Sequence, residues 1–344
     1  MKRLQHPGRP LLLTVAAAIA AAVAGVVVAS GAGASKKVHI AYFAPQANTY
    51  AQATYQGLVE AGKKLNADVT RFDTGFDAQK EYSQIQDATT LKKFQAFVII
   101  ALDPVSLVPA VKAAIKAGIK VVNTDLVLGP RFGAQKPQVA GQAGTVVDLP
   151  GYRAQSEVNQ LLVLACKDLN PCNVGWIAGF ATIDFERSIK YQLGAVTKTH
   201  PNIKLVAYQD GGGYLADPAL KIAQNMLQAH PNINLLATSG DQMTLGAEIA
   251  VKGAGGIGKI RIISGGLSCP GQKAVQDGRW FGGTIAVPKT EGVIGATIAI
   301  YAARGQKTTP YGTIPVGVSA SKLSGYPQVM TKKNIGKYKC EYSG

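Results

Sequence analysis

Acidic and aromatic side chains stand where strand-like apolar runs give way to helix-like segments. Asp125 follows the run IKVVNT, and Asp241 follows INLLAT after two intervening residues. A carboxylate accepts two hydroxyl hydrogen bonds, and an Arg presents a planar fork of donors. Aromatic rings can cover the apolar face of a small molecule. These residue types therefore predict contacts to a polar ligand, and the candidates are Asn48, Tyr50, Asp103, Asp125, Arg187, Tyr214 and Asp241.

Each candidate also has a purely structural interpretation. Asp241, Asn48 and Asp103 stand where a helix begins, so they could act only as helix caps. Asp125 precedes no obvious helix, and capping explains it poorly. Arg187 is expected in the first turn of a helix, where the macrodipole disfavours a cation, and this favours a functional role. Tyr50 could equally be a core residue.

The elements that must position these residues alternate regularly. Short β-branched runs begin about 30 residues apart, the span of a strand-helix-strand unit, and they fall into two blocks. Alternating strands and helices predict parallel sheets covered by helices on both faces, with ligands bound at the carboxyl ends of the strands. The strand-like runs begin at Val38, Ala67, Ala96 and Ile119, and then at Asn173, Ile203, Ile233 and Ile260. Helices are expected near 50–65, 77–93, 105–117, 184–198, 217–229 and 241–252.

The predicted fold class is therefore α/β, with two doubly wound parallel-sheet lobes joined by a hinge of several strands. The N-terminal lobe is expected to comprise 36–138 plus 288–313, and the C-terminal lobe 139–287 plus 314–344. The hinge is expected at 138–141 and at 281–285. Facing turns from the two lobes would then line one cleft.

The first residues read as an export signal. A basic start is followed by an apolar stretch and by the small residues Ala32-Gly-Ala34, so we expect a signal peptide over 1–34, cleaved after Ala34. The stretch is long enough to remain as an uncleaved anchor instead. The chain has a net charge of +16, but its Lys residues are scattered and no nucleic-acid module accompanies them, which favours a solvated surface.

Four cysteines fit an exported, oxidising setting. Cys166 and Cys172 enclose a short link between a helix and a strand, so a local disulfide is plausible there. It would leave Cys269 to pair with Cys340. A zinc site is less favoured, because no close Cys or His spacing supports one.

Patterns typical of enzymes are missing from the sequence. Gly253-Ala-Gly-Gly-Ile-Gly258 matches the dinucleotide fingerprint by letter, but a helix precedes it and a strand follows, the reverse of the required order. No nucleophile motif or His-Glu-x-x-His segment is present. We therefore expect no enzyme activity, no metal and no cofactor.

Four segments together resemble the ribose- and galactose-type periplasmic sugar-binding proteins, which belong to cluster B, type I, and serve ATP-driven importers. The resemblance covers about 36–327, and Gly240–Gly246 (GDQMTLG) is its most specific match. It implies the type I periplasmic binding protein fold and two lobes that close on a sugar for delivery to a permease. The other segments are Asn48–Gly57, Asp125 and Glu186-Arg187.

Several positions depart from the pattern of that family. Leu126 stands where an Arg is usual, Gly240 where an Asn is usual, and Gly265-Gly266 where many sugar binders carry an Asp. Ala286-Val287 replaces a frequent polar position. Fewer polar anchors predict a less hydroxyl-rich ligand, or one held by other groups such as Trp176, Phe180 or Tyr214.

The resemblance leaves alternatives open. The ligand could be a non-sugar molecule, aromatic or anionic, and the closed form could be presented to a sensor instead of a permease. The sensory core of a sugar-responsive repressor shares this fold, but the export signal and the lack of a DNA-binding helix pair argue against it.

Overall fold

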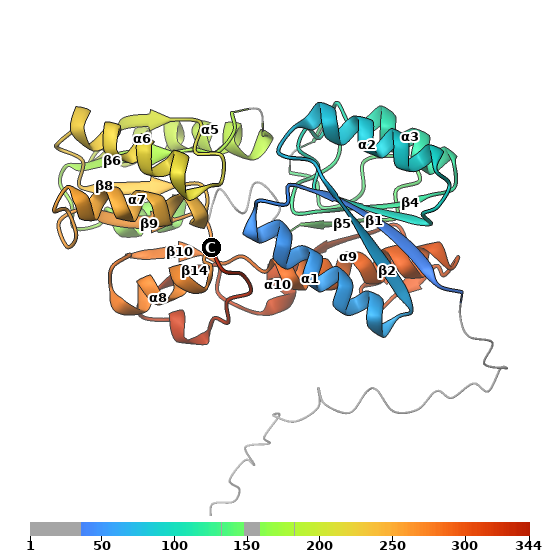
Figure 1. Cartoon of the computed structure of the whole chain (residues 1–344). Coiled ribbons are helices and arrows are strands. Elements are labelled where there is room, and N and C mark those ends of the chain that lie inside the picture. The colour runs from blue at the N-terminus through green and yellow to red at the C-terminus, as the bar shows by residue number, and fades with distance from the viewer. Residues whose placement is uncertain (1–35, 132, 148–158, 182) are drawn as a thin grey trace, which may run out of the picture. The chain divides into compact units, whose positions relative to one another are not determined.

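The structure is a computed structural model that describes residues 36–131, 133–147, 159–181 and 183–344 (Figure 1). The expected signal peptide, 1–34, lies outside the described residues. Two six-stranded sheets organise the described chain, and every strand pair in them is parallel except β10 with β14. Both sheets carry helices on both faces, which confirms the α/β class and the doubly wound architecture predicted from the alternating pattern.

The first sheet has the strand order β13-β5-β4-β3-β1-β2. Its four expected strands form where the apolar, β-branched runs predict them, and they are nearly all buried apart from the edge strand β2. Two further strands, β5 and β13, complete the sheet. The bounds are β1 Val38–Ala44, β2 Ala67–Asp73, β3 Ala96–Ile99, β4 Lys120–Thr124, β5 Gly144–Val147 and β13 Val316–Ser319.

The second sheet has the order β14-β10-β9-β8-β6-β7 and repeats the first arrangement. In each sheet a strand from the distal part of the chain is added at one edge. The bounds are β6 Cys172–Ile177, β7 Ile203–Gln209, β8 Leu235–Thr238, β9 Arg261–Ser264, β10 Gly282–Thr284 and β14 Val329–Thr331. A separate two-stranded ribbon joins β11 Thr308–Thr309 to β12 Gly312–Thr313.

Helices α1 and α9 pack on one face of the first sheet, and α2 and α3 pack on the other. In the second lobe α6, α7 and α8 share one core, whereas α5 and the helical residues 159–165 share the other. The bounds are α1 Thr49–Lys64, α2 Ala78–Thr90, α3 Val108–Lys116, α5 Asp184–Thr199, α6 Ala216–Ala229, α7 Asp241–Gly253, α8 Cys269–Asp277, α9 Pro288–Ala303, α10 Ala320–Ser324 and the 3₁₀ turn η1 Ile335–Lys337.

The approach of α1 to α9 depends on glycine. A Cβ at Gly57 would lie 2.0 Å from the carbonyl oxygen of Lys289, and a Cβ at Gly292 would lie 2.0 Å from that of Thr54. Neither position has room for a side chain, so the two backbones meet directly. This contact fixes α1, whose first turn carries Asn48 and Tyr50, against the returning helix.

The lobe boundaries differ from the expected ones at two of three places. β5 lies beyond the expected boundary at 138 but pairs with β4, and β13 lies beyond 313 but pairs with β5. Residues 138–141 therefore precede the last consecutive strand of the first sheet and are not a crossing segment. Near 287 the chain passes from β10 of the second sheet to α9, which packs on the first.

Two disulfides are present, Cys166–Cys172 and Cys269–Cys340, and among the described residues no cysteine is free. The first closes the short connection before β6, as its spacing predicts. The second ties the start of α8 to the chain end, 71 residues later. Both predicted pairings are thus confirmed.

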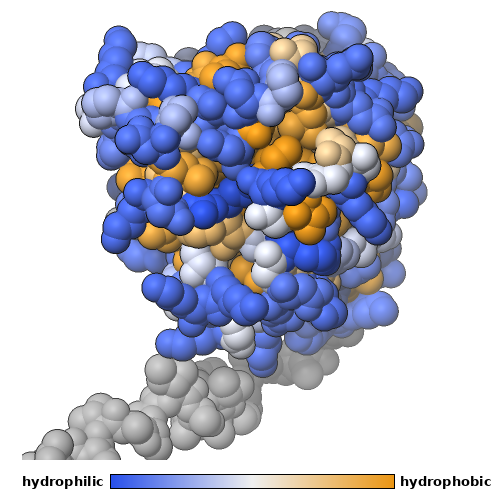
Figure 2. All heavy atoms as spheres, turned by 90° about the vertical axis from the view of Figure 1, so that its left-hand side faces the viewer, coloured by the Kyte–Doolittle hydropathy of each residue, from blue (hydrophilic) through white to orange (hydrophobic). Residues whose placement is uncertain are grey.

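The face of the second lobe seen in Figure 2 is covered mostly by hydrophilic residues, with apolar residues scattered between them. Large exposed apolar side chains on the second lobe include Leu164, Tyr191 and Ile249. Of the helices described, none has the length and apolar character needed to cross a membrane.

Candidate functional site

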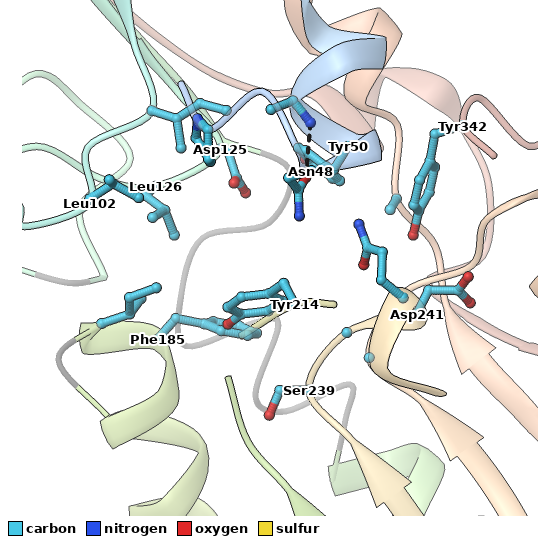
Figure 3. A pocket seen from close by; sticks show the side chains of 18 of the residues that line it. Asn48, Tyr50, Leu102, Asp125, Leu126, Phe185, Tyr214, Ser239, Asp241 and Tyr342 are labelled. Atoms are coloured by element: carbon cyan, nitrogen blue, oxygen red, sulfur yellow. Dashed lines mark hydrogen bonds between the residues drawn. The ribbon is translucent and has the colours of Figure 1, made fainter. Parts of the chain in front are cut away.

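A cavity of about 160 Å³ lies between the two lobes, where the carboxyl ends of the strands from both sheets meet (Figure 3). Turns that follow β1, β4, β8 and β9 contribute to its wall, as expected for this class of sheet. The described lining residues are Pro45, Asn48, Tyr50, Ala51, Phe76, Ile100, Leu102, Asp125, Leu126, Val127, Ile183, Phe185, Tyr214, Ser239, Gly240, Asp241, Gln242, Gly265, Thr284, Ile285, Ala286 and Tyr342.

Asp125 is the unpaired acid of this cavity. It follows β4 directly, in the left-handed region at φ 61°, and Figure 3 shows its carboxyl group directed into the cavity. No hydrogen bond or ion pair joins it to any residue that the structure describes. Burial raises the pKa of Asp125 from 3.8 to about 7, and no neighbouring cation offsets this. An acid held this way is prepared to accept hydrogen bonds from a ligand.

Asn48 contributes a donor from the same lobe. Its Oδ1 accepts a hydrogen bond from Ala51 N (3.0 Å) and caps α1, so the cap interpretation is correct for this half of the amide. The same cap fixes the side chain and leaves the amide nitrogen pointing into the cavity (Figure 3). Capping and ligand contact are therefore compatible at this residue.

Tyr50 is the second residue of α1, two positions after Asn48. Its hydroxyl donates to Glu291 Oε2 (2.9 Å), and its ring packs edge-on against Tyr342 with centroids 5.8 Å apart. The Tyr50 hydroxyl is thus hydrogen-bonded to α9, and its ring forms part of the cavity wall.

The ring of Tyr214 forms the floor of the cavity in the second lobe. A Cβ at Gly179 would lie 2.4 Å from Tyr214 Cε2, and a Cβ at Gly240 would lie 2.7 Å from Tyr214 Cδ1. The ring therefore needs glycine at both positions. This explains the departure at Gly240, because a larger side chain there would collide with Tyr214.

A buried polar network holds Tyr214 in place. Glu186 accepts hydrogen bonds from Tyr214 Oη (2.7 Å), Gly179 N (2.6 Å) and Ser239 Oγ (2.7 Å). Trp176 Nε1 in turn donates to Ser239 Oγ (3.0 Å). Burial raises the pKa of Glu186 to about 7, although these hydrogen bonds oppose the shift. Trp176 thus belongs to the core, and its hydrogen bond to Ser239 helps to fix that residue of the cavity wall.

Asp241 reaches the cavity wall but turns its carboxyl group away from the space (Figure 3). The helix cap is Gly240, and no side-chain cap hydrogen bond is made, so the cap interpretation of Asp241 is wrong. Its Oδ1 accepts from Ser264 Oγ (3.4 Å), and its buried Oδ2 has no hydrogen-bond partner among the described residues. Burial raises the pKa of Asp241 to about 7, opposed by hydrogen bonds from Ser268 and Ser264.

Asp103 and Arg187 are the two candidates that the structure does not place on the cavity wall. Asp103 Oδ1 accepts hydrogen bonds from Val105 N (3.0 Å) and Ser106 N (2.9 Å). Burial alone would raise the pKa of Asp103. The hydrogen bonds and the positive charge of Arg187 outweigh this effect, so the pKa is lowered. Arg187 itself is exposed on α5. A ligand role for either residue stays a prediction.

Several polar or aromatic residues of the cavity wall were not among the sequence candidates, and Gln242 and Tyr342 are two of them. Gln242 follows Asp241, and its Nε2 donates to Thr49 Oγ1 of the opposite lobe (3.3 Å). Its position in the first turn of α7 could have suggested it. Tyr342 comes from the chain end, and no local pattern points to it.

Within the part of the chain that the structure describes, no group of acidic, His or Cys side chains could hold a metal ion.

Two α/β lobes whose strand ends enclose one small cavity define a class of proteins that hold a small solute between the lobes. The chain belongs to the periplasmic binding protein family, because the family described as "Periplasmic binding protein domain" matches residues 40–307. This confirms the resemblance and the class of function that the sequence indicated.

Named relatives agree with this assignment. The D-ribose/D-allose-binding protein of Pseudomonas aeruginosa is 30% identical over 172 residues, about half of each chain (49% of this one and 50% of that one). The D-allose-binding periplasmic protein of Escherichia coli is 26% identical over 76% of this chain and 82% of its own. By these names the relatives are sugar-binding proteins.

A solved structure shows the same fold. The periplasmic solute-binding protein of an ABC transporter from Actinobacillus succinogenes, with bound D-allose, superposes with a TM-score of 0.72. It is 23% identical and covers 88% of this chain and all of its own. The predicted type I periplasmic binding protein fold is thereby confirmed.

Proposed function

We propose that this protein is an exported binding protein that captures one sugar or sugar-like ring between its lobes and delivers it to the permease of an ABC transporter. Its role is binding, with no catalytic step. The single observation that carries the proposal is Asp125, an unpaired carboxyl group pointing into a partly open cavity that is otherwise largely apolar. The relatives named for ribose and allose support the choice of a sugar.

The size of the cavity favours a single ring. A cavity of about 160 Å³ is close to the roughly 150 Å³ apolar cavity that accommodates benzene in another protein. A monosaccharide or cyclitol is one ring with short substituents. A disaccharide would need more space than the described cavity offers.

The wall chemistry fits a ring with hydroxyl groups on one side and an apolar face on the other. The Asp125 carboxylate can accept two hydroxyl hydrogen bonds, and the Asn48 amide can donate to another oxygen. The rings of Tyr214 and Phe185 line the opposite side, as Figure 3 shows, and can cover the apolar face.

Charge argues against an anionic ligand. The described lining residues include Asp125 and Asp241 but no Lys, Arg or His. A carboxylate or phosphate in this cavity would meet uncompensated acids and no cation, although the chain as a whole has a charge of +16. The excess of basic residues therefore lies outside the binding cavity.

A thermal-shift screen of the purified protein tests the proposal. Pentoses, hexoses, polyols, aromatic acids and sugar phosphates are compared at equal concentration. A neutral monosaccharide or cyclitol at a hundred times its dissociation constant should stabilise the protein by about 2.7 kcal/mol. If only aromatic acids or sugar phosphates shift the melting temperature, the sugar assignment fails.

The export and delivery steps have separate tests. N-terminal sequencing of the secreted protein should begin at Ser35 if the segment before it is a cleaved signal peptide. The liganded protein should stimulate the ATPase of the cognate transporter in liposomes. Stimulation of a sensor kinase without any effect on the transporter would support the sensing alternative.

A further inference from the structure

The end of the chain is fastened to the second lobe. Cys340 is bonded to Cys269 at the start of α8, and Cys269 N donates to Tyr342 O (2.8 Å). Just before it, the buried Tyr338 hydroxyl lies within hydrogen-bond distance of Leu267 O (2.6 Å) and Ala286 O (2.7 Å). The last residues are therefore held to the lobe by a covalent bond as well as by packing.

The same segment reaches across to the first lobe. Glu341 accepts hydrogen bonds from Thr290 N (2.8 Å) and from the Thr290 hydroxyl, in the first turn of α9. An amide in that turn has no partner within its own helix, and a carboxylate suits the positive end of the macrodipole. Glu341 thus acts as a cap supplied by the other lobe.

The next residue enters the cavity. Tyr342 is only 6% exposed and lines the cavity wall, where its ring packs edge-on against Tyr50 of α1. Figure 3 shows it facing the space from the side opposite Leu126. Three successive residues therefore have different roles. Cys340 bonds the segment to α8, Glu341 binds α9 of the first lobe, and Tyr342 lines the cavity.

We propose that residues 340–342 form a disulfide-anchored strap, and that Tyr342 is a ligand-contacting residue which sets the size and affinity of the cavity. The proposal rests on the cavity being the ligand site of the proposed function. Fixing the backbone of residues 340–342 costs about 1–2 kcal/mol per residue, and the Cys269–Cys340 disulfide removes much of this cost before the ligand arrives. Such preorganisation raises affinity without adding contacts.

Removing the disulfide by C269S/C340S tests the strap, and the other disulfide offers a matched control, C166S/C172S. D-allose, D-ribose, D-arabinose and myo-inositol serve as probes in isothermal titration calorimetry. We expect the dissociation constant to rise at least tenfold in C269S/C340S and to change less than twofold in C166S/C172S. Y342A should weaken binding similarly, whereas Y191A, at the 77% exposed Tyr191, should not.

A second measurement tests the strap in the absence of ligand. Hydrogen exchange at the Thr290 amide should accelerate at least tenfold in C269S/C340S and stay unchanged in C166S/C172S, because only the first releases Glu341. If no probe binds the wild type, the sugar assignment fails while exchange still tests the strap. Unchanged exchange, or a probe that binds C269S/C340S or Y342A as tightly as wild type, would overturn the strap. Should C269S/C340S not fold, Y342A alone decides.

Discussion

Replacing Asp125 by Asn should stabilise the empty protein and weaken ligand binding. The pKa of Asp125 is raised from 3.8 in the unfolded chain to about 7 in the fold by burial. Below about pH 3 both states hold the proton, so the acid costs nothing, and at pH 4 the cost is still small. Between pH 4 and 7 the unfolded state ionises first, and stability falls. Above pH 7 the penalty is complete.

The magnitude follows from that difference in pKa. It corresponds to about 4 kcal/mol, as an upper bound, because the Asp125 side chain is only partly buried from solvent. At about 2 °C per kcal/mol, D125N should melt up to about 8 °C higher at pH 8 and at nearly the same temperature as wild type at pH 4. Asn tolerates the left-handed backbone at this position, so no new strain is introduced.

Calorimetric melting at both pH values, with isothermal titration at pH 8, measures the two effects. Loss of hydrogen bonds to a charged group should weaken binding about 10- to 100-fold. Asp87→Asn, on the exposed face of α2, is the matched control and should change neither quantity. An equal melting temperature for D125N and wild type at pH 8, or the same gain at pH 4, would refute the reasoning.

Three further outcomes follow from the packing and charge of the site. Gly57→Ala should lower the free energy of unfolding in urea by about 1–3 kcal/mol or more, because the added Cβ would collide with the Lys289 carbonyl. Gly194→Ala, where nothing lies near the added Cβ on the exposed face of α5, should raise it by about 0.5–1 kcal/mol. Glu186→Ala should destabilise by roughly 3 kcal/mol, since it leaves three buried donors unpaired, and a loss below about 1 kcal/mol in the same assay would contradict the network. D-Galacturonate and D-ribose 5-phosphate should give no thermal shift, and a shift by either would show that a cation reaches the cavity.

The regular part of the fold could be predicted from the sequence because its signals are local. Apolar β-branched runs and helical spacing placed eight strands and six helices close to where the structure has them. β5 and β13 were not predicted because both are short and contain Gly, and β13 also joins the sheet through β5, a partner far back in the chain. Because β5 and β13 were not expected in the first sheet, the predicted boundaries at 138 and 313 fall short of the strands that complete it.

The candidate site divides along similar lines. Asp125 and Tyr214 could be placed near the cavity because ligands of parallel sheets bind where strands end. The orientation of Asp241 could not, because it depends on Ser264 and Ser268 in the following unit of the fold. Tyr342 could not be placed for a different reason, since the Cys269–Cys340 bond and the contacts around it bring it to the wall from a distant part of the chain.

The two tryptophans of this chain differ in what they touch. Trp176 is hydrogen-bonded to Ser239, a residue of the cavity wall, while Trp280 donates to Glu248 outside it. Both are 1% exposed, so solvent quenches neither. The emission of Trp176 should therefore respond when the cavity fills, and the unlabelled protein carries its own optical sensor.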